Sequence, residues 1–204
     1  DGINLESLVE KYGAQSDGRV IDILKQICGS LYEAHSLGLV HRDIKPGNSM
    51  LLKDGTLRIT DFSIARIQAT SKTATGAVLG TPLYMSPEQA RGEPVDARSD
   101  LFSLGTVLYT LATGRTPFRA ESTYGILRRL TDESPRPLRE ISPQFPAWFE
   151  MIVHKLLAKS PADRFASATE IAQLLEGCLA HVQQPATVPL PTEAQGAAFD
   201  AAGK

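Results

Sequence analysis

The sequence predicts an α+β fold that is mainly helical and contains one small β-hairpin. Apolar residues recur at helical spacing over several long segments, which favours helices through most of the chain. Asp54-Gly55 lies between two short apolar-rich runs, and this dipeptide is typical of a tight hairpin turn. The 204 residues are 42% hydrophobic and 22% charged, so they suffice for one domain with a sizeable core.

Each predicted helix is located by its apolar face and by the residues at its ends. A short helix over residues 3–12 has Asn4 as its cap, and Gly13 ends it. A longer helix covers residues 19–37, and Gly38 closes it. Further helices are expected near residues 100–113, 121–131, 145–158 and 167–181.

Two segments are predicted to lack regular structure. Residues 64–98 have no sustained periodicity and are rich in Thr, Gly and Pro, which predicts a long surface loop. A loop of that length in one domain is usually functional. From Gln183 onward the chain is rich in Pro and Ala and has little apolar bulk, so residues 183–204 are expected to form a disordered tail or linker.

Charge and cysteine content argue against several classes of function. The net charge of −2 gives no reason to expect nucleic acid or an anionic membrane as the main partner. Cys28 and Cys178 are far apart and lack CxxC spacing, which favours two buried thiols over a disulfide framework or a zinc site. The longest apolar run, residues 101–114, is too short to span a bilayer and is interpreted as a buried core helix.

The predicted hairpin brings polar residues of one loop close to a second carboxylate. A two-residue turn at Asp54-Gly55 places Asn48 opposite Asp61 at the open end of the strands, although a bulge would shift this register. An amide oxygen and a carboxylate are hard ligands that suit Mg²⁺. Asp43 and Lys45 border the same volume. A carboxylate base, a metal pair and a lysine fit phosphoryl transfer.

These residues resemble those of a known family. HRDIKPGN, residues 41–48, matches the catalytic loop of the eukaryotic-type (Hanks-type) serine/threonine protein kinases, and the helical part looks most like bacterial members. Other segments match in the family's order: DFS for DFG, GTPLYMSPE for the end of the activation segment, RSDLFSLGTVLYTLATGRTPF for the central helix of the large lobe, and DRF for the arginine site. The resemblance implies a kinase large lobe, a partial catalytic domain, over residues 1–182.

The resemblance implies a chemical role for each matched residue of the site. Asp43 would accept or orient the proton of a substrate hydroxyl, and Lys45 would hold the γ-phosphate of ATP. Asn48 and Asp61 would bind Mg²⁺, and Met50 would form part of the floor under adenine. ATP and Mg²⁺ are therefore the implied cofactors, and protein Ser/Thr hydroxyls are the implied substrates.

The resemblance also implies regulatory and substrate-binding residues. Arg42 marks a type that loop phosphorylation regulates, because an arginine there can pair with a phosphothreonine. Thr70, Ser71, Thr73 and Thr75 are the candidate phosphosites, with Thr73 and Thr75 preferred, although this Thr/Ser cluster is also consistent with an ordinary polar loop. Lys45 and Thr81, the latter at the P+1 position, indicate Ser/Thr rather than Tyr specificity.

Structural roles are implied for the remaining matched residues. Asp100 would tie the central helix to the catalytic loop, and Glu88 would form a buried ion pair with Arg164. His41 resembles a general base, but in this family it is a packed structural histidine, and Phe62 is also expected to be structural.

Two departures from the family's pattern leave alternatives open. Nothing in these residues matches a G-x-G-x-x-G-x-V loop, a V-A-I-K lysine or its helix glutamate. The small lobe is therefore expected to be absent, and the fragment to be inactive alone. Ser63 replaces a glycine whose backbone angles cost serine about 1 kcal/mol or more. A pseudokinase scaffold or a truncated, inactive product are the alternatives to the enzyme.

The resemblance also bears on location and partners. A cytoplasmic protein, or the cytoplasmic domain of a membrane-anchored kinase, is expected. A homodimer for activation and a membrane tether outside these residues stay open.

Overall fold

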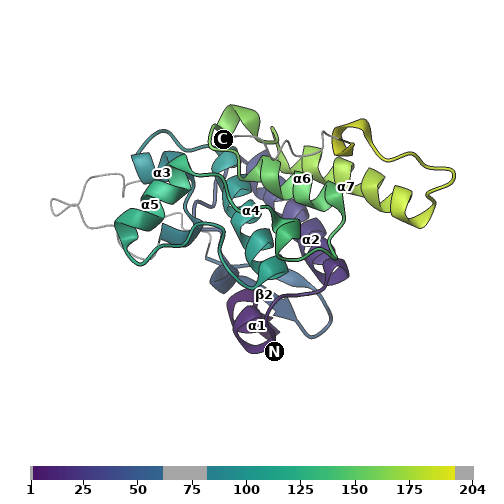
Figure 1. Ribbon diagram of the computed structural model, residues 1–204, viewed down its shortest axis with the longest axis horizontal. Coiled ribbons are helices and arrows are strands. Elements are labelled where there is room, and N and C mark those ends of the chain that lie inside the picture. Colours follow the sequence, from purple (N-terminus) through teal and green to yellow (C-terminus); the bar gives the residue numbers. More distant parts are fainter. Residues whose placement is uncertain (1, 62–81, 196–204) are drawn as a thin grey trace.

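Helices make up most of the structure, a computed structural model that describes residues 2–61 and 82–195. The central helix α4 (Ala97–Thr113) is buried from Ser99 to Ala112. α1 (Leu5–Tyr12), α2 (Asp17–Ser36) and α6 (Ala147–Leu156) pack against it, and α7 (Ala168–Gln183) packs on α2 (Figure 1). The predicted mainly helical α+β fold is confirmed.

A small antiparallel sheet lies next to α1 and α2 (Figure 1). Its strands are β1 (Gly2–Asn4), β2 (Ser49–Leu52) and β3 (Leu57–Ile59), in the order β1-β2-β3. The sequence predicted β2 and β3 as a hairpin but not β1, whose residues were assigned partly to the first helix. Asn4 is that helix's cap as predicted, because its Oδ1 accepts a hydrogen bond from the Ser7 N–H at 2.7 Å.

The hairpin register differs by one residue from the prediction. The Leu52 N–H donates to the Thr56 carbonyl at 2.8 Å, which closes a three-residue loop instead of a two-residue turn. Gly55 has a φ of 85°, typical of the glycine that ends such a loop in a bulge. The extra loop residue moves Asn48 opposite Thr60, whose N–H donates to the Asn48 carbonyl at 2.9 Å. The prediction that Asn48 directly faces Asp61 was therefore wrong.

The side chain of Gln26 fixes the hairpin on α2. Its Nε2 donates to the Gly55 carbonyl at 2.9 Å, and its Oε1 accepts from the Leu57 N–H at 2.6 Å. The Gln26 amide thus provides a hydrogen-bond partner for a loop carbonyl and for a strand N–H, which would otherwise have to bond to water. The hairpin is consequently held by a residue of α2 at the point where its loop ends and β3 begins.

The remaining helices lie close to their predicted positions, with one addition. α6 falls within the predicted range, and α5 (Thr123–Asp132) and α7 differ from theirs by one or two residues at their ends. α3 (Pro87–Arg91) lies inside the predicted long loop. Its start shows a capping box between Ser86 and Gln89 with Pro87 at the first position, a local signal that sequence reasoning missed. Short 3-10 turns are η1 (Pro46–Asn48), η3 (Pro82–Tyr84), η4 (Leu138–Glu140), η5 (Pro161–Asp163) and η6 (Thr192–Ala194).

Gly105 allows α4 and α6 to approach closely. A Cβ at this position would lie 2.8 Å from the Leu156 Cβ, closer than side chains pack. The side chains of Leu156 and Leu157 therefore pack directly against the backbone of α4 at this point.

The segment after α7 folds back onto the helices over residues 184–195. His181 Nδ1 donates to the Val188 carbonyl at 2.7 Å, and Ala194 is 6% exposed. Leu190 packs against the core, and Pro191 fills the space beside Gly177. The structure thus differs from the expected disordered tail in this part; residues 196–204 lie outside the described residues, and the domain boundary at 182 stays a prediction.

Glu88 and Arg164 form a buried, bidentate ion pair at distances of 2.7 and 2.8 Å. Ser99 Oγ also donates to Glu88 Oε1 at 2.6 Å. Burial raises the pKa of Glu88, but the hydrogen bonds from Arg164 and Ser99 outweigh burial and hold it below its ordinary value. The pair joins α3 to the segment before α7. Arg164 also donates to the carbonyl of Ala158, after α6, at 2.8 Å.

Lys159 joins the end of α5 to the segment after α6. Its Nζ donates to the Leu130 carbonyl at 2.7 Å and lies 3.7 Å from the centre of the Phe118 ring. Burial, and next the positive charge of Arg164, lower the pKa of Lys159 to about 7.

The lowered pKa of Lys159 predicts that stability increases with pH above about 7. The unfolded chain keeps the ordinary lysine pKa of 10.5, so above about pH 7 it binds a proton that the folded chain has released. The free energy of unfolding should therefore rise from pH 7 to 8.5, measured by urea unfolding. Lys159→Met should flatten this rise, whereas Lys25→Met, at an exposed position, should not.

At higher pH the thiol of Cys28, whose pKa burial raises to about 12, changes the stability in the opposite direction. An unchanged pH slope in Lys159→Met would contradict the prediction.

Candidate active site

Asp100 lies in the core and fixes the start of the loop 41–48 by hydrogen bonds. Its carboxylate is fully buried in the first turn of α4. Oδ1 accepts from the Arg42 N–H at 2.7 Å, and Oδ2 accepts from the His41 N–H at 2.8 Å. Arg42 has a φ of 67°, in the left-handed region that L-residues rarely adopt. The two hydrogen bonds stabilise this conformation, which sets the direction in which the chain continues to Asp43.

His35 is a third donor to Asp100 that sequence reasoning missed. Its Nε2 lies 2.9 Å from Asp100 Oδ2, so this nitrogen carries the proton. The His35 Nδ1 is buried and has no hydrogen-bond partner within residues 2–61 and 82–195. The sequence analysis treated His35 as an ordinary helix residue, because a contact across 65 positions leaves no local signal.

Both ring nitrogens of His41 are engaged inside the protein. Nε2 lies 3.0 Å from the Thr60 carbonyl and must donate to it, while Nδ1 accepts from the Asp43 N–H at 3.3 Å. The ring is buried and connects the loop to the end of β3. These contacts fit the structural role that the sequence suggested, rather than the role of a general base.

Asp43, Lys45 and Asn48 meet at one carboxylate oxygen. Lys45 Nζ lies 2.8 Å from Asp43 Oδ2, and Asn48 Nδ2 lies 3.1 Å from the same atom. Asn48 Nδ2 also donates to the Asp43 carbonyl at 3.0 Å. The Asp43 side chain is 29% exposed, and its Oδ1 has no hydrogen bond within the described part of the chain. Asp43 is therefore held on one side and open to a reactant on the other.

The local sequence explains how Asn48 reaches Asp43. Ile44 is 1% exposed and fixes the middle of the loop in the core. Pro46 begins the turn η1, where its missing N–H costs nothing. The Asn48 N–H and Ser49 Oγ both donate to the Lys45 carbonyl, at 3.1 and 3.2 Å. This tight turn points the Asn48 side chain back toward Asp43.

Asn48 is oriented so that its amide oxygen stays available to a cation. Because Nδ2 is used by Asp43, the Oδ1 atom is the free end, and it makes no hydrogen bond to another described residue. Asp61 follows Thr60, the residue opposite Asn48, and is exposed with a φ of 59°. Within residues 2–61 and 82–195, no group of three or more His, Cys, Asp or Glu side chains could hold a metal. These two oxygen donors suit a cation that keeps waters or phosphate oxygens in its shell, as Mg²⁺ does.

Gln89 is a further contact of the loop that sequence reasoning did not find. Its Nε2 donates to the Arg42 carbonyl at 2.8 Å, while its Oε1 accepts from the Ser86 N–H at 2.9 Å. Arg42 is thus held through its N–H by Asp100 and through its carbonyl by Gln89. α3 and α4 together therefore fix the residue that precedes Asp43.

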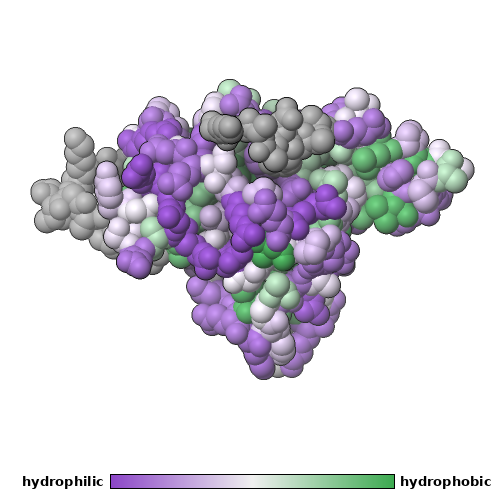
Figure 2. All heavy atoms as spheres, in the orientation of Figure 1, coloured by the Kyte–Doolittle hydropathy of each residue, from purple (hydrophilic) through white to green (hydrophobic). Residues whose placement is uncertain are grey.

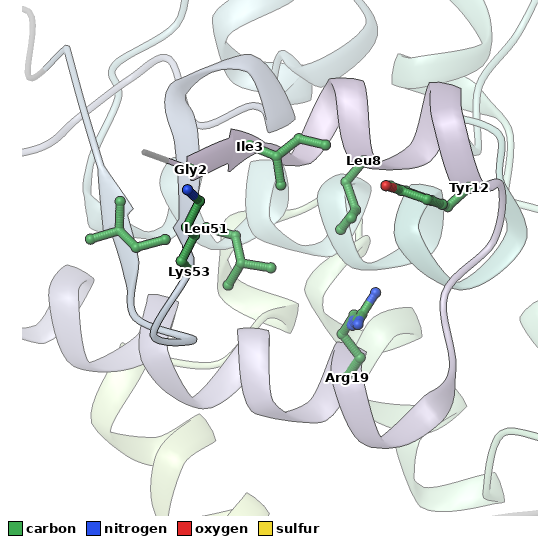
Figure 3. Close-up of a pocket in the computed structure, with 8 residues that line it drawn as sticks. Gly2, Ile3, Leu8, Tyr12, Arg19, Leu51 and Lys53 are labelled. Atoms are coloured by element: carbon green, nitrogen blue, oxygen red, sulfur yellow. The ribbon is translucent and has the colours of Figure 1, made fainter.

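A hollow of about 750 Å³ lies apart from this loop (Figure 3). Ile3, Leu8 and Tyr12 approach it from β1 and α1, and Arg19 approaches it from α2. Leu51 also lines it, but Met50 and residues 41–48 do not. The hollow is consequently not part of the predicted nucleotide site.

Several predicted residues lie outside the described residues: Phe62, Ser63, Thr70, Ser71, Thr73, Thr75 and Thr81. Among the helices that are described, none combines the length and apolar character that crossing a membrane requires.

Comparisons with known proteins agree with the sequence motifs. A family model described as "Protein kinase domain" matches residues 1–176. A probable serine/threonine-protein kinase of Corynebacterium efficiens is 38% identical over 200 residues, which cover 90% of this chain and 30% of the relative. The serine/threonine-protein kinase PknB of Mycolicibacterium smegmatis is 41% identical over 174 residues, which cover 84% of this chain and 28% of the relative. The chain thus spans less than a third of the length of these relatives.

Solved structures share the fold. The structure of Rad53 residues 1–466 in complex with AMP-PNP matches with a TM-score of 0.70 and 26% identity, covering 84% of this chain and 43% of that one. The PknI kinase domain of Mycobacterium tuberculosis matches with a TM-score of 0.65 and 28% identity, covering 86% of this chain and 61% of that one. The family model covers most of the residues of the chain, and the relatives and solved structures agree with it. The chain therefore belongs to the protein kinase domain family.

Proposed function

We propose that this chain is the large-lobe part of a serine/threonine protein kinase that transfers the γ-phosphoryl group of ATP to protein hydroxyls. The observation that carries the proposal is the arrangement of Asp43, Lys45 and Asn48 around one carboxylate oxygen. The relatives named as serine/threonine-protein kinases support the reaction type.

Asp43 acts as the group that orients the substrate hydroxyl and accepts its proton. Its Oδ2 is occupied by Lys45 and Asn48, so Oδ1 is the oxygen that faces the hydroxyl. The proton moves to Asp43 as the hydroxyl oxygen bonds to the γ-phosphorus and the bond from that phosphorus to the bridging oxygen of ADP breaks. The Lys45 ammonium compensates negative charge on the transferred phosphoryl oxygens.

Asn48 and Asp61 would hold Mg²⁺ through the amide Oδ1 and the carboxylate. When bound, the metal neutralises charge on the phosphate oxygens of ATP. The fit rests on the donor set, since both oxygens are hard ligands and the Asn48 amide is already turned by its contact with Asp43.

The adenine of ATP is proposed to lie against Met50, which is partly buried in the central strand β2. The 204 residues include no match to a Gly-rich phosphate loop or a strand lysine, so a small lobe is needed to cover the phosphates. Because ATP is the phosphoryl donor, the proposed activity belongs in the cytoplasm.

A binding scaffold without catalysis is the second candidate. Serine at position 63, where the family has glycine, is the observation that favours it. Asp43, Asn48 and Asp61 are all retained, which favours the enzyme. Activity of the full-length protein separates the two candidates.

Asp43→Asn should reduce kcat by about 100-fold or more, because an amide cannot accept the hydroxyl proton. Phosphate transfer from labelled ATP to a basic test protein by the full-length kinase measures the effect. Asp54→Asn, in the exposed hairpin loop, is the matched control and should keep full activity. Equal transfer by wild type and Asp43→Asn would reject the role of Asp43, and no transfer by wild type would favour the scaffold.

Gln89→Leu should lower kcat several-fold and leave the KM for peptide nearly unchanged. The substitution leaves the Arg42 carbonyl without its donor, at a cost of about 1–3 kcal/mol, part of which falls on the geometry of Asp43. Steady-state kinetics of the full-length kinase provide the measurement. Gln173→Leu, on the exposed side of α7, serves as the control. An unchanged kcat would show that Gln89 does not position the loop.

Thr73 or Thr75 should carry phosphate after the full-length kinase is incubated with ATP. Either phosphothreonine could pair with Arg42, which would couple the modification to the residue next to Asp43. Mass spectrometry of proteolytic peptides locates the phosphate. If phosphate is found solely outside residues 70–81, this prediction is wrong.

A further inference from the structure

A second hollow, of about 720 Å³, lies beside α5. It is formed by residues 115–122, which follow α4, and by residues 133–141, which follow α5. None of its lining residues belongs to the loop 41–48 or to the hairpin. Its position therefore separates it from the candidate active site.

Four arginines line this hollow, which we call the arginine hollow: Arg115, Arg119, Arg129 and Arg136. Two of them have acidic partners, since Arg129 lies 3.5 Å from Glu133 and Arg136 lies 2.9 Å from Glu140. Arg115 and Arg119 make no side-chain hydrogen bond or ion pair to any residue within 2–61 and 82–195. The hollow thus contains two guanidinium groups that are uncompensated in the sense that no described carboxylate lies within ion-pair distance of them, although Glu121 also lines the hollow.

Tyr109 forms part of the floor of the hollow. The buried phenol of Tyr109 lines the hollow, and its hydroxyl donates to the Arg136 carbonyl at 3.0 Å. Burial raises the pKa of this phenol, and the charges of Arg115, Arg136 and Arg119 act against burial. Three guanidinium groups from different segments therefore lie near enough to one side chain to affect its ionisation.

Arg119 and Arg129 are linked through the backbone as well. The Arg129 Nη1 donates to the Arg119 carbonyl at 2.5 Å, which ties α5 to the segment that carries Arg115 and Arg119. Phe118, in the same segment, is 1% exposed and lies under the ammonium group of Lys159. These contacts fix the backbone of the segment that carries Arg115 and Arg119, so that this wall of the hollow is formed before a ligand arrives.

The charge and the volume of the arginine hollow indicate which class of ligand it can bind. A phosphate monoester carries nearly two negative charges, which match the two uncompensated arginines better than one carboxylate does, and guanidinium groups bind phosphate through paired hydrogen bonds. The volume exceeds that of a single phosphate ion, and the lining includes the partly buried apolar side chains of Pro117 and Ile141. Glu121 and Glu133 also line the hollow and would repel a long polyanion such as nucleic acid.

We propose that the arginine hollow binds a phosphorylated segment of a protein, with Arg115 and Arg119 contacting the phosphate. Neighbouring residues of the segment lie against the apolar part of the floor. The surface over α5 and the segments beside it is mostly hydrophilic, which suits an extended, polar peptide (Figure 2). The site is separate from phosphoryl transfer, and its binding does not depend on the role of Asp43.

The test measures binding of a fluorescein-labelled peptide of Gly, Ala and Asn with one phosphoserine to the full-length protein without ATP. Fluorescence anisotropy should show binding at least about tenfold tighter than for the same peptide with unmodified serine, because charged hydrogen bonds are lost with the phosphate. The double variant Arg115→Gln/Arg119→Gln should lose this difference. Arg128→Gln, on the exposed face of α5 and outside the hollow, should keep it.

A second double variant, Arg115→Lys/Arg119→Lys, keeps the charge but removes the paired donors, and it should show weaker yet measurable discrimination. Circular dichroism establishes that each variant is folded. Equal affinity for the two peptides, or wild-type affinity in Arg115→Gln/Arg119→Gln, would overturn the proposal. Competition by inorganic phosphate as strong as that by unlabelled phosphopeptide would show an anion site only and would also overturn it.

Discussion

The buried carboxylate of Asp100 is the interaction on which the candidate active site depends. Burying a carboxylate is costly unless hydrogen bonds satisfy it, and here His35 and the backbone N–H groups of His41 and Arg42 all donate to it. In return, the carboxylate holds Arg42 in a conformation that its own local preferences disfavour. The shape of the loop that carries Asp43 is therefore determined by the core.

Basic side chains have different roles at the end of the molecule that contains α3 and α5. The Glu88–Arg164 pair is compensated and buried, whereas Lys159 is placed between aromatic rings and helix-end carbonyls, where its charged form is less favoured. Arg115 and Arg119 remain without acidic partners in the part of the chain that is described. The same region thus uses arginine and lysine in three ways: as a structural tie, as a titrating group and as free surface charge.

Much of the fold could be predicted because its signals are local. Apolar periodicity and end residues located α1, α2 and α5, and the spacing of Asp43, Lys45 and Asn48 brought these three side chains together correctly. The register could not be predicted, because Asp54-Gly55 is compatible with loops of two or three residues. The contacts of His35 with Asp100 and of Gln89 with Arg42 span 65 and 47 positions, and no pattern in one sequence reveals such pairs.

The absence of a side chain at Gly105 has a mechanical consequence. Where the side chains of Leu156 and Leu157 fill the space that a side chain at position 105 would need, α4 and α6 cannot slide or spread without opening a void or colliding, since close-packed interiors deform very little. α4 and α6 must therefore move as one solid block. α3, by contrast, contacts the loop through the Gln89 amide and the rest of the core through the buried Glu88–Arg164 pair, so a shift of α3 would reach both the loop and the segment before α7.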